Sequence, residues 1–385
     1  MLIPRGDAVA LTRALVAIDS RNPTLVPGAP GESECAHFLA AVLGEWGFAV
    51  EVLEQVPGRP NLLARLGPPE TSATPPLMLA GHLDVVGVDG MTHPPFAAAV
   101  DGGRIFGRGA ADMKSGLAAM CAAAAGAVNA NSRKSVVIAA VVDEEYESLG
   151  MRALLAGGVR AEVALLTEPT RLAICPAHRG FIWMDVTVHG RAAHGSRYDL
   201  GVDAITHAGL LLAELDDLEH LRESGRTHPL LGRPSLHAST ISGGAGMSTY
   251  PERCELALER RTLPGETKED AMTEIQDVIA RVRAREPRLN ARVILNTAQS
   301  PSDVSVTAPV VERLASALRA EGLPQRVEGL SAWTDAALLN EAGIPAICFG
   351  PGDIALAHSA EEWVAIAEIE AATRVLTGFV ADWCS

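Results

Sequence analysis

The sequence has too little positive charge for a protein that binds nucleic acid or a membrane surface. Only 32 Lys and Arg residues face 47 Asp and Glu residues, which gives a net charge of -15. An excess of this sign repels phosphate backbones and anionic lipids, so we expect neither kind of partner. Solubility is a sufficient reason for most of the carboxylates. The useful question is whether a few of them converge on one site.

The sequence also lacks the segments that export or anchor a chain. Charged residues at Arg5, Asp7, Arg13 and Asp19 interrupt any signal-peptide core, and the longest run of small apolar residues, 117–128, is too short to span a bilayer. The six cysteines form no CxxC pair, and most lie in apolar runs, where a reduced thiol behaves as a small hydrophobic group. We therefore expect a cytoplasmic protein.

Motifs of three common enzyme classes are missing. There is no GxSxG, which counts against a serine hydrolase, and no HExxH, which counts against a mononuclear metalloprotease. Neither a Walker loop nor a complete GxGxxG after a strand is present, so no nucleotide cofactor is expected.

The residues that are present predict an α/β fold in two domains. A length of 385 residues with 48% hydrophobic residues suits two packed cores. Short apolar runs that end in polar clusters and precede helical periodicity predict a mostly parallel sheet between helices. From residue 180 to 296 the order becomes strand, helix, two strands, helix, strand, typical of the α+β ferredoxin-like fold. We predict that residues 180–296 are inserted into a catalytic domain made of residues 1–179 and 297–385.

Histidines and carboxylates follow the apolar runs, at the strand ends where α/β sheets bind ligands. The segments are GHLDVVG with His82 and Asp84, GRGAADMKSG with Asp112, DEE with Glu144 and Glu145, TEPT with Glu168, and LAHSAEEWV with His358. Taken one at a time, these residues are typical of surface turns, helix caps and solvated charges.

Five of these residues together predict a metal centre. Nitrogen and oxygen ligands without thiolates suit zinc or a related divalent ion, and an acidic residue shared between two ions would make the centre dinuclear. Beyond the last histidine, Ser359 and Glu362 fit a helix capping box, so we expect a helix to begin there. The five candidate ligands are His82, Asp112, Glu145, Glu168 and His358.

These motifs together resemble a known enzyme family. GHLDVVG, GRGAADMKSG, DEE, TEPT, HGRAAHGS and GPGDIALAHSAEEWV are similar, in order and over nearly the whole chain, to segments of the acetylornithine deacetylase, succinyl-diaminopimelate desuccinylase, aminoacylase and glutamate carboxypeptidase family of dinuclear zinc metallopeptidases. The resemblance implies a zinc-peptidase catalytic domain with an inserted lid and dimerisation domain. It also implies two Zn²⁺ per subunit, with Co²⁺ or Mn²⁺ as possible substitutes.

The resemblance assigns a role to each candidate ligand. His82 and Glu168 would hold one zinc, Glu145 and His358 would hold the other, and Asp112 would bridge them. It further implies a cis peptide bond after Asp112.

Three other residues would act in catalysis under this resemblance. Asp84 would orient the ligand His82, as carboxylates often do for ligating imidazoles. Glu144 would be the general base that takes a proton from water and returns it to the leaving amine. His194, in HGRAAHGS, would supply an oxyanion donor to the partner subunit of a homodimer. Alone, His194 would be typical of an exposed loop.

Residues that bind the substrate are predicted less directly. Arg261 in ERRTLPGE would grip a substrate carboxylate in a bidentate fashion, whereas Arg260 would face solvent. The resemblance is broken at Ser248, where many family members have Asn, so specificity does not transfer from them. Other candidates for the substrate pocket are His237, Thr334, Asp335 and the amides of Gly350 and Gly352, for which simple turn chemistry is an equal alternative.

The sequence thus predicts a metal-dependent amidohydrolase acting on a small N-acyl amino acid, as a homodimer formed through the inserted domain. The alternative is a dipeptidase or exocarboxypeptidase with the same zinc site, because both substrates carry a scissile amide beside a free carboxylate. A binding protein that has lost turnover is disfavoured by the presence of Glu144. The acyl group, the amino acid and the physiological metal stay open.

Overall fold

The computed structural model describes residues 3–70, 74–129, 131–221 and 225–385. The chain divides into two compact units, and unit 2 is inserted in the sequence of unit 1. Unit 1 comprises Met1–Pro176, Val304–Leu330 and Thr334–Ser385, and unit 2 comprises Ala177–Asp303 and Ser331–Trp333.

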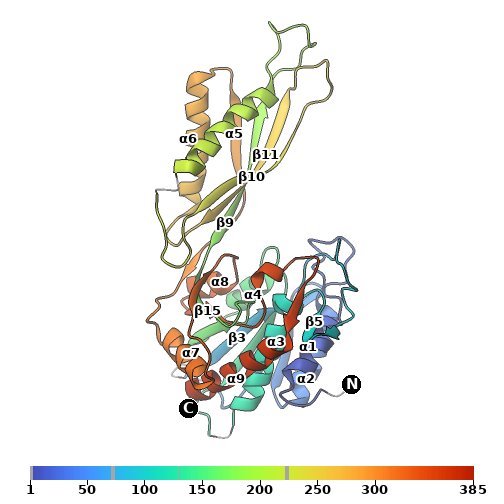
Figure 1. Cartoon of the computed structure of the whole chain (residues 1–385), viewed down its shortest axis with the longest axis vertical. Helices are drawn as coiled ribbons and strands as arrows, with labels where there is room; N and C mark the ends of the chain where they lie inside the picture. The colour runs from blue at the N-terminus through green and yellow to red at the C-terminus, as the bar shows by residue number, and fades with distance from the viewer. Residues whose placement is uncertain (1–2, 71–73, 130, 222–224) are drawn as a thin grey trace. The chain divides into compact units, whose positions relative to one another are not determined.

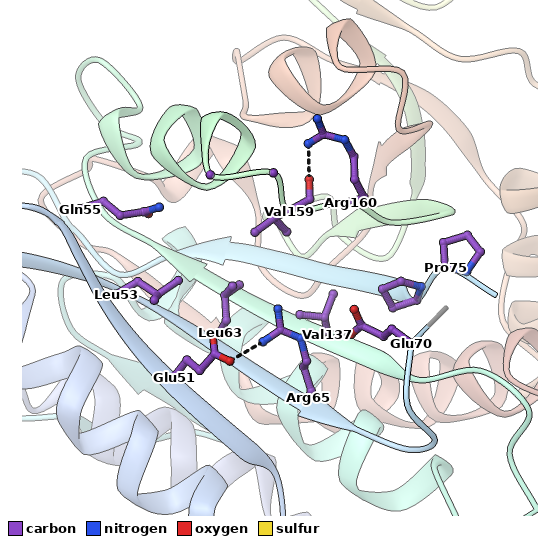
Figure 2. Close-up of a pocket in the computed structure, with 13 residues that line it drawn as sticks. Glu51, Leu53, Gln55, Leu63, Arg65, Glu70, Pro75, Val137, Val159 and Arg160 are labelled. Atoms are coloured by element: carbon purple, nitrogen blue, oxygen red, sulfur yellow. Dashed lines mark hydrogen bonds and ion pairs between the residues drawn. The ribbon is translucent and has the colours of Figure 1, made fainter. Parts of the chain in front are cut away.

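The sheet of unit 1 has the strand order β1-β2-β6-β3-β7-β15-β8, with β14 also paired to β8. Figure 1 labels β3 and β15 of this sheet and the helices around them. The four central strands β6, β3, β7 and β15 run parallel, and the strands flanking them are antiparallel. The predicted α/β fold with a mostly parallel central sheet is therefore confirmed. The strands are β1 (Ala49–Val56), β2 (Arg59–Leu66), β3 (Leu77–His82), β6 (Val136–Val141), β7 (Val163–Leu166), β8 (Ile174–His178), β14 (Val327–Leu330) and β15 (Ala346–Cys348).

The parallel strands are apolar because the sheet is covered on both faces. Every residue of β3, β6, β7 and β15 is buried, which gives the continuous hydrophobic runs seen in the sequence rather than an alternation. The helices of this unit are α1 (Ala8–Val16), α2 (Ser33–Glu45), α3 (Ser115–Ala127), α4 (Leu149–Ala156), α7 (Pro309–Ala320), α8 (Ala336–Glu341) and α9 (Ile366–Trp383).

Helix α3 lies in the centre of this core and packs against α1 and α9. It is apolar nearly all round and consists largely of alanine, so neighbouring elements approach it closely. None of the helices in the described ranges has both the length and the apolar character that a membrane crossing requires.

The segment after His358 departs from the prediction. Residues 363–365 form a strand, β16 (Trp363–Ala365), which pairs with β5 (Arg104–Phe106), and β5 in turn pairs with β4 (Ala99–Asp101). The helix begins only at Ile366, and Ala365 is its N-cap. The capping box predicted at Ser359 and Glu362 is therefore wrong, because Glu362 is recruited by a distant loop.

Unit 2 contains an antiparallel sheet of order β10-β11-β9-β12 with two helices, which is the ferredoxin-like arrangement. Side chains of both helices and of the strands form one hydrophobic core. The strand β11 alternates between buried and exposed residues, as expected where one sheet face is covered. The elements are β9 (Gly180–His189), α5 (Ala204–Leu221), β10 (Ser235–Gly243), β11 (Arg253–Thr262), α6 (Lys268–Arg285) and β12 (Asn290–Gln299). The short β13 (Ser302–Asp303) pairs with the end of β8.

Candidate metal centre

The carboxyl ends of the four parallel strands carry the predicted ligands. His82 is the last residue of β3, and Glu145 lies in the turn after β6. Glu168 follows β7 by two residues, and the chain leaving β15 leads to His358. Because parallel strands end on the same edge of a sheet, residues far apart in the sequence meet there.

Among the described residues, two groups of side chains have the composition and spacing to hold a metal ion. One consists of His82, Asp112 and Glu168, and the other of Asp112, Glu145 and His358; within each group the ligand atoms lie within 4.8 Å of one another. Asp112 belongs to both groups. Its Oδ1 is 3.1 Å from Nε2 of His82, and its Oδ2 is 3.6 Å from Nε2 of His358. The grouping is the one that the family resemblance implies.

A tightly held turn presents Asp112. The peptide bond between Asp112 and Met113 is cis. The buried carboxylate of Glu362 accepts hydrogen bonds from the amides of Ala111 and Asp112, and its other oxygen is 2.7 Å from Arg108. At the start of α3, a Cβ on Gly116 would lie 1.9 Å from the carbonyl oxygen of Thr167, so only glycine lets this helix approach the end of β7. Asp112 and Glu168 are thus brought together by backbone packing.

The electrostatics of the site are those of crowded, buried carboxylates. Burial raises the pKa of Glu144 and of Glu168 well above the ordinary value, and neighbouring carboxylates add to the effect. Burial also raises the pKa of Glu145. For Asp112, burial alone would raise the pKa, but the hydrogen bond to His82 and the charges of His82, His358 and Arg108 together outweigh burial and lower the pKa.

Both histidines are held as cations by these acids. Burial alone would lower their pKa values, but the hydrogen bond of His82 to Asp112 and its closeness to Glu144 raise its pKa well above the ordinary value. In the same way the bond to Glu145 raises the pKa of His358 to about 9.

This donor set fits divalent cations. Oε1 of Glu168 is buried and has no hydrogen-bond partner among the described residues, although an oxygen of this kind is normally satisfied. Carboxylate and imidazole ligands without thiolates suit zinc and similar ions. A cation in each group would relieve the repulsion between the carboxylates and leave both imidazoles free to ligate.

Asp84 and Glu144, which were predicted to act in catalysis rather than to bind a metal, lie outside the two candidate ligand groups. The Asp84 carboxylate is fully buried and accepts hydrogen bonds from the amides of Glu144 and Glu145, each at 3.1 Å. Nδ1 of His82 lies 2.9 Å from the Asp84 backbone oxygen but 3.7 Å from its Oδ1. Asp84 therefore fixes His82 mainly through its main chain and the Glu144–Glu145 turn through its carboxylate.

Two of the predicted substrate residues in unit 1 are buried beside this edge of the sheet. Thr334 packs with its hydroxyl 3.4 Å from Sγ of Cys348. Asp335 is 1% exposed, and burial raises its pKa to about 7.

The amides of Gly350 and Gly352 in the same unit donate hydrogen bonds within the protein. The Gly350 amide donates to Thr170 Oγ1 at 3.0 Å, and the Gly352 amide donates to Glu368 at 2.8 Å. Both donors are thus used within the protein in this structure, and the role of these amides in the substrate pocket stays a prediction.

In unit 2, the loops carry the predicted lid residues at the surface. His194 is exposed, its Nδ1 is 2.8 Å from Ser196 Oγ, and Gly195 donates its amide to the carbonyl oxygen of Ser248. His237 is exposed on β10, where Ser239 lies 3.3 Å away.

The two adjacent arginines of β11 reverse one expectation. Arg260 was expected to face solvent, but it is buried. Its side chain is 4% exposed and pairs with Glu266 and Glu274. Arg261 is half-buried, pairs with Glu259 and lies over the ring of Phe181 at 5.4 Å.

Sequence reasoning missed the buried polar residues behind the site. Asn22 contacts Asp84 and Asp143, and Arg59 contacts Asp143, although 62 to 121 positions separate the partners in the sequence. No local pattern marks either residue; only the run of three acids from Asp143 to Glu145 signals that a positive or amide partner is required.

Comparisons with known proteins agree with this geometry. The profile of peptidase family M20/M25/M40 matches residues 78–382. The chain belongs to this family. Acetylornithine deacetylase of Proteus mirabilis is 28% identical over 98% of this chain and 96% of its own length, and that of Myxococcus xanthus is 31% identical over 80% of each. An N-formyl-4-amino-5-aminomethyl-2-methylpyrimidine deformylase of Halalkalibacterium halodurans is 27% identical, covering 99% of this chain and 95% of the deformylase.

Solved structures of the M20 family have the same fold. A tripeptidase from Staphylococcus aureus superposes with a TM-score of 0.79 at 19% identity, over 99% of both chains. A Bacillus subtilis dinuclear metal binding peptidase from the M20 family superposes with a TM-score of 0.74 at 15% identity, over 98% of this chain and 97% of the other.

Proposed function

We propose that this M20-family chain removes a small acyl group from the nitrogen of an amino acid, with two divalent cations as cofactors and Glu144 as general base. One observation carries the proposal. Glu144 follows Asp143 and precedes the candidate ligand Glu145, yet it belongs to neither of the two ligand groups that share Asp112. Its Oε2 lies 3.9 Å from Nε2 of His82. A carboxylate next to the ligands but outside the ligand groups has the position of a general base.

The choice of a small acyl group rests on the curated relatives. Those that align over most of the chain are named for removing an acetyl group or a formyl group from nitrogen. The amines that they release differ from one another. The relatives therefore support a small acyl group as the part removed, but they do not indicate which amine carries it.

In the proposed mechanism, the chain's own residues position and move the proton. Glu144 accepts a proton from the attacking water and delivers it to the leaving nitrogen. Asp84 holds the Glu144 amide at 3.1 Å and so limits movement of the base. When bound, the two cations would supply an activated water near neutral pH and a Lewis acid for the scissile carbonyl. His82 and Glu168 would hold one cation, Glu145 and His358 the other, and Asp112 both.

The metal, the assembly and the location complete the proposal. We infer Zn²⁺ as the metal, with Co²⁺ or Mn²⁺ as substitutes, because oxygen-rich ligand sets accept all three. Unit 2 would form the interface of a homodimer, in which the exposed His194 serves the partner's site and Arg261 binds the substrate carboxylate. The six cysteines are buried and unpaired, which supports a reducing compartment such as the cytoplasm.

A substrate panel tests the acyl specificity. The zinc-loaded chain is assayed against N-acetyl, N-formyl and N-succinyl amino acids and against dipeptides. We expect hydrolysis of N-acetyl or N-formyl amino acids, with activity removed by a chelator and restored by Zn²⁺ or Co²⁺. Cleavage confined to dipeptides would instead identify a dipeptidase with the same centre. Activity that survives complete metal removal would rule out the cofactor.

A further inference from the structure

A buried polar network lies behind the turn that carries Glu144 and Glu145. Its members come from the segment before α2, from the start of β2 and from the residues just after β3 and β6. All are at most 8% exposed, and each makes at least two polar contacts with the others or with the turn. They are Asn22, Glu32, Arg59, Asp84 and Asp143.

Asn22 joins the two carboxylates of the network. Its Nδ2 donates to Oδ2 of Asp84 at 2.9 Å and to Oδ1 of Asp143 at 3.0 Å. Its Oδ1 accepts from the amide of Thr24 at 2.9 Å, which fixes the orientation of the side-chain amide. Both hydrogens of one amide nitrogen are therefore used to keep two buried carboxylates together.

Arg59 neutralises the other side of the network. Its Nη1 is 2.7 Å from Oδ1 of Asp143, and its Nε and Nη2 both bind the Glu32 carboxylate. A guanidinium can satisfy two carboxylates in one plane, which an ammonium group does less well. Without Arg59, Asp143 and Glu32 would be buried without their cation.

The carboxylates in turn hold the backbone of the turn. Asp84 accepts from the amides of Glu144 and Glu145, and Oδ2 of Asp143 accepts from the amide of Glu147 at 3.2 Å and of Leu149 at 3.4 Å. Asp143 itself has a φ of 67°, a left-handed conformation that a non-glycine residue adopts only when its surroundings impose it. The network thus fixes the turn on both sides of Glu144 and Glu145.

We propose that Asn22 and Arg59 are positioning residues, which act through Asp84 and Asp143 to hold Glu144 and Glu145 in place. The inference rests on the proposed function, in which Glu144 is the base and Glu145 a ligand. Partners that orient metal ligands typically affect metal affinity or activity about 10- to 100-fold although they touch neither metal nor substrate.

The first test is the substitution Asn22→Asp. It keeps the size of the side chain but replaces both donors with acceptors. We expect kcat and the affinity for Zn²⁺ to fall about 10- to 100-fold, with KM nearly unchanged because substrate contacts are untouched. In the metal-free chain, amide hydrogen exchange of the peptide covering residues 143–149 should accelerate.

The second test removes the positive charge of Arg59 together with the negative charge of Glu32. Removing both charges avoids leaving Glu32 as a buried carboxylate without its cation. In the double variant Arg59→Met/Glu32→Gln, Asp143 alone loses its cation. We expect the same loss of kcat and Zn²⁺ affinity, whereas Glu32→Gln alone should have a much smaller effect. The matched control is Lys134→Met/Glu162→Gln, which removes an ion pair of 2.6 Å that has no contact with the turn. This control should keep wild-type kcat and exchange.

The outcomes separate this proposal from the proposed function. If the double variant folds and retains wild-type exchange at residues 143–149, Zn²⁺ affinity and kcat, the network only stabilises the fold and the proposal is wrong. If the wild-type chain hydrolyses none of the panel, the proposed function fails, and exchange and Zn²⁺ affinity still decide whether the network positions the turn. Should Asn22→Asp not fold, the double variant decides alone.

Discussion

The imidazole of His358 lies against the carboxylate of Glu145, with Nε2 at 2.9 Å from Oε2. The two residues are 213 positions apart and come from the chain that follows β15 and from the turn after β6. In the metal-free chain this contact is an ion pair, because the hydrogen bond to Glu145 and the nearby Asp112 raise the pKa of His358 to about 9. A metal ion held by His358 would therefore compete with a proton for the same nitrogen.

This competition predicts pH-dependent metal binding. Below a pH of about 9 the metal-free His358 carries a proton that ligation must displace, so the apparent affinity for Zn²⁺ should rise with pH up to about 9. Calorimetric titrations at pH 7 in buffers of different ionisation enthalpy should show net proton release. Binding at pH 7 without proton release would contradict the assignment of His358 as a ligand.

The substitution Glu144→Gln should separate catalysis from metal binding. We expect kcat to fall by about 10²- to 10⁴-fold, the usual contribution of a general base, with two metal ions still bound. The matched control is Glu147→Gln, the same change at an exposed position of the same turn. Metal analysis and steady-state kinetics of both variants test this. Turnover by Glu144→Gln at the wild-type rate would eliminate Glu144 as the base.

Mixing two inactive variants should show whether His194 acts across a dimer. His194→Ala and Glu144→Ala are each expected to be inactive. In mixed dimers, one site combines an intact Glu144 with the partner's intact His194. Random mixing of equal amounts should restore about a quarter of wild-type activity in a two-fold symmetric dimer. No recovery in a preparation that light scattering shows to be dimeric would exclude this role.

His178 should make the protein sensitive to acid. It is 2% exposed, its Nε2 has no partner among the described residues, and burial lowers its pKa to about 4. Between pH 6.5 and about 4 the unfolded chain binds a proton at this residue that the folded chain does not, so the free energy of unfolding decreases as pH falls. At about 1.4 kcal/mol per pKa unit, the full loss is about 3 kcal/mol.

Urea unfolding at pH 7.5 and pH 5 measures this effect. The variant His178→Leu should lose less stability between the two pH values than the wild type does. The control His37→Gln changes an exposed histidine of α2. Its free energy of unfolding should differ between pH 7.5 and pH 5 by as much as that of the wild type does. Equal losses in the wild type and in His178→Leu would show that other groups cause the acid sensitivity.

Local patterns predicted the parts of the site that depend on local structure. Buried parallel strands read as apolar runs, and the residues just after them, such as His82 and Glu168, converge because the strands share an edge. The role of Glu362 was not predictable in this way. Because Glu362 lies three residues after Ser359, the pair fits a capping box. In the structure the Glu362 carboxylate instead accepts hydrogen bonds from the buried Arg108 and from the amides of Ala111 and Asp112.

The same limit applies to the partners of Arg260 and Gly350. Alternation along β11 placed Arg260 opposite Arg261 correctly, but it gave no information about Glu266 and Glu274, which allow an arginine to be buried. The Gly350 amide donates to Oγ1 of Thr170, 180 positions earlier, and no local pattern indicates this contact. Such contacts form only in the packed fold. A single sequence shows which residues are present, but it does not show which of them meet.

The position of unit 2 within the sequence also sets the order in which the candidate metal ligands are synthesised. His82, Asp112 and Glu168 all precede unit 2, which begins at Ala177, whereas His358 follows it. A nascent chain therefore contains one complete ligand group before unit 2 has been translated, and the other only after it. Translation makes the two halves of the centre available at different times, although Asp112 belongs to both.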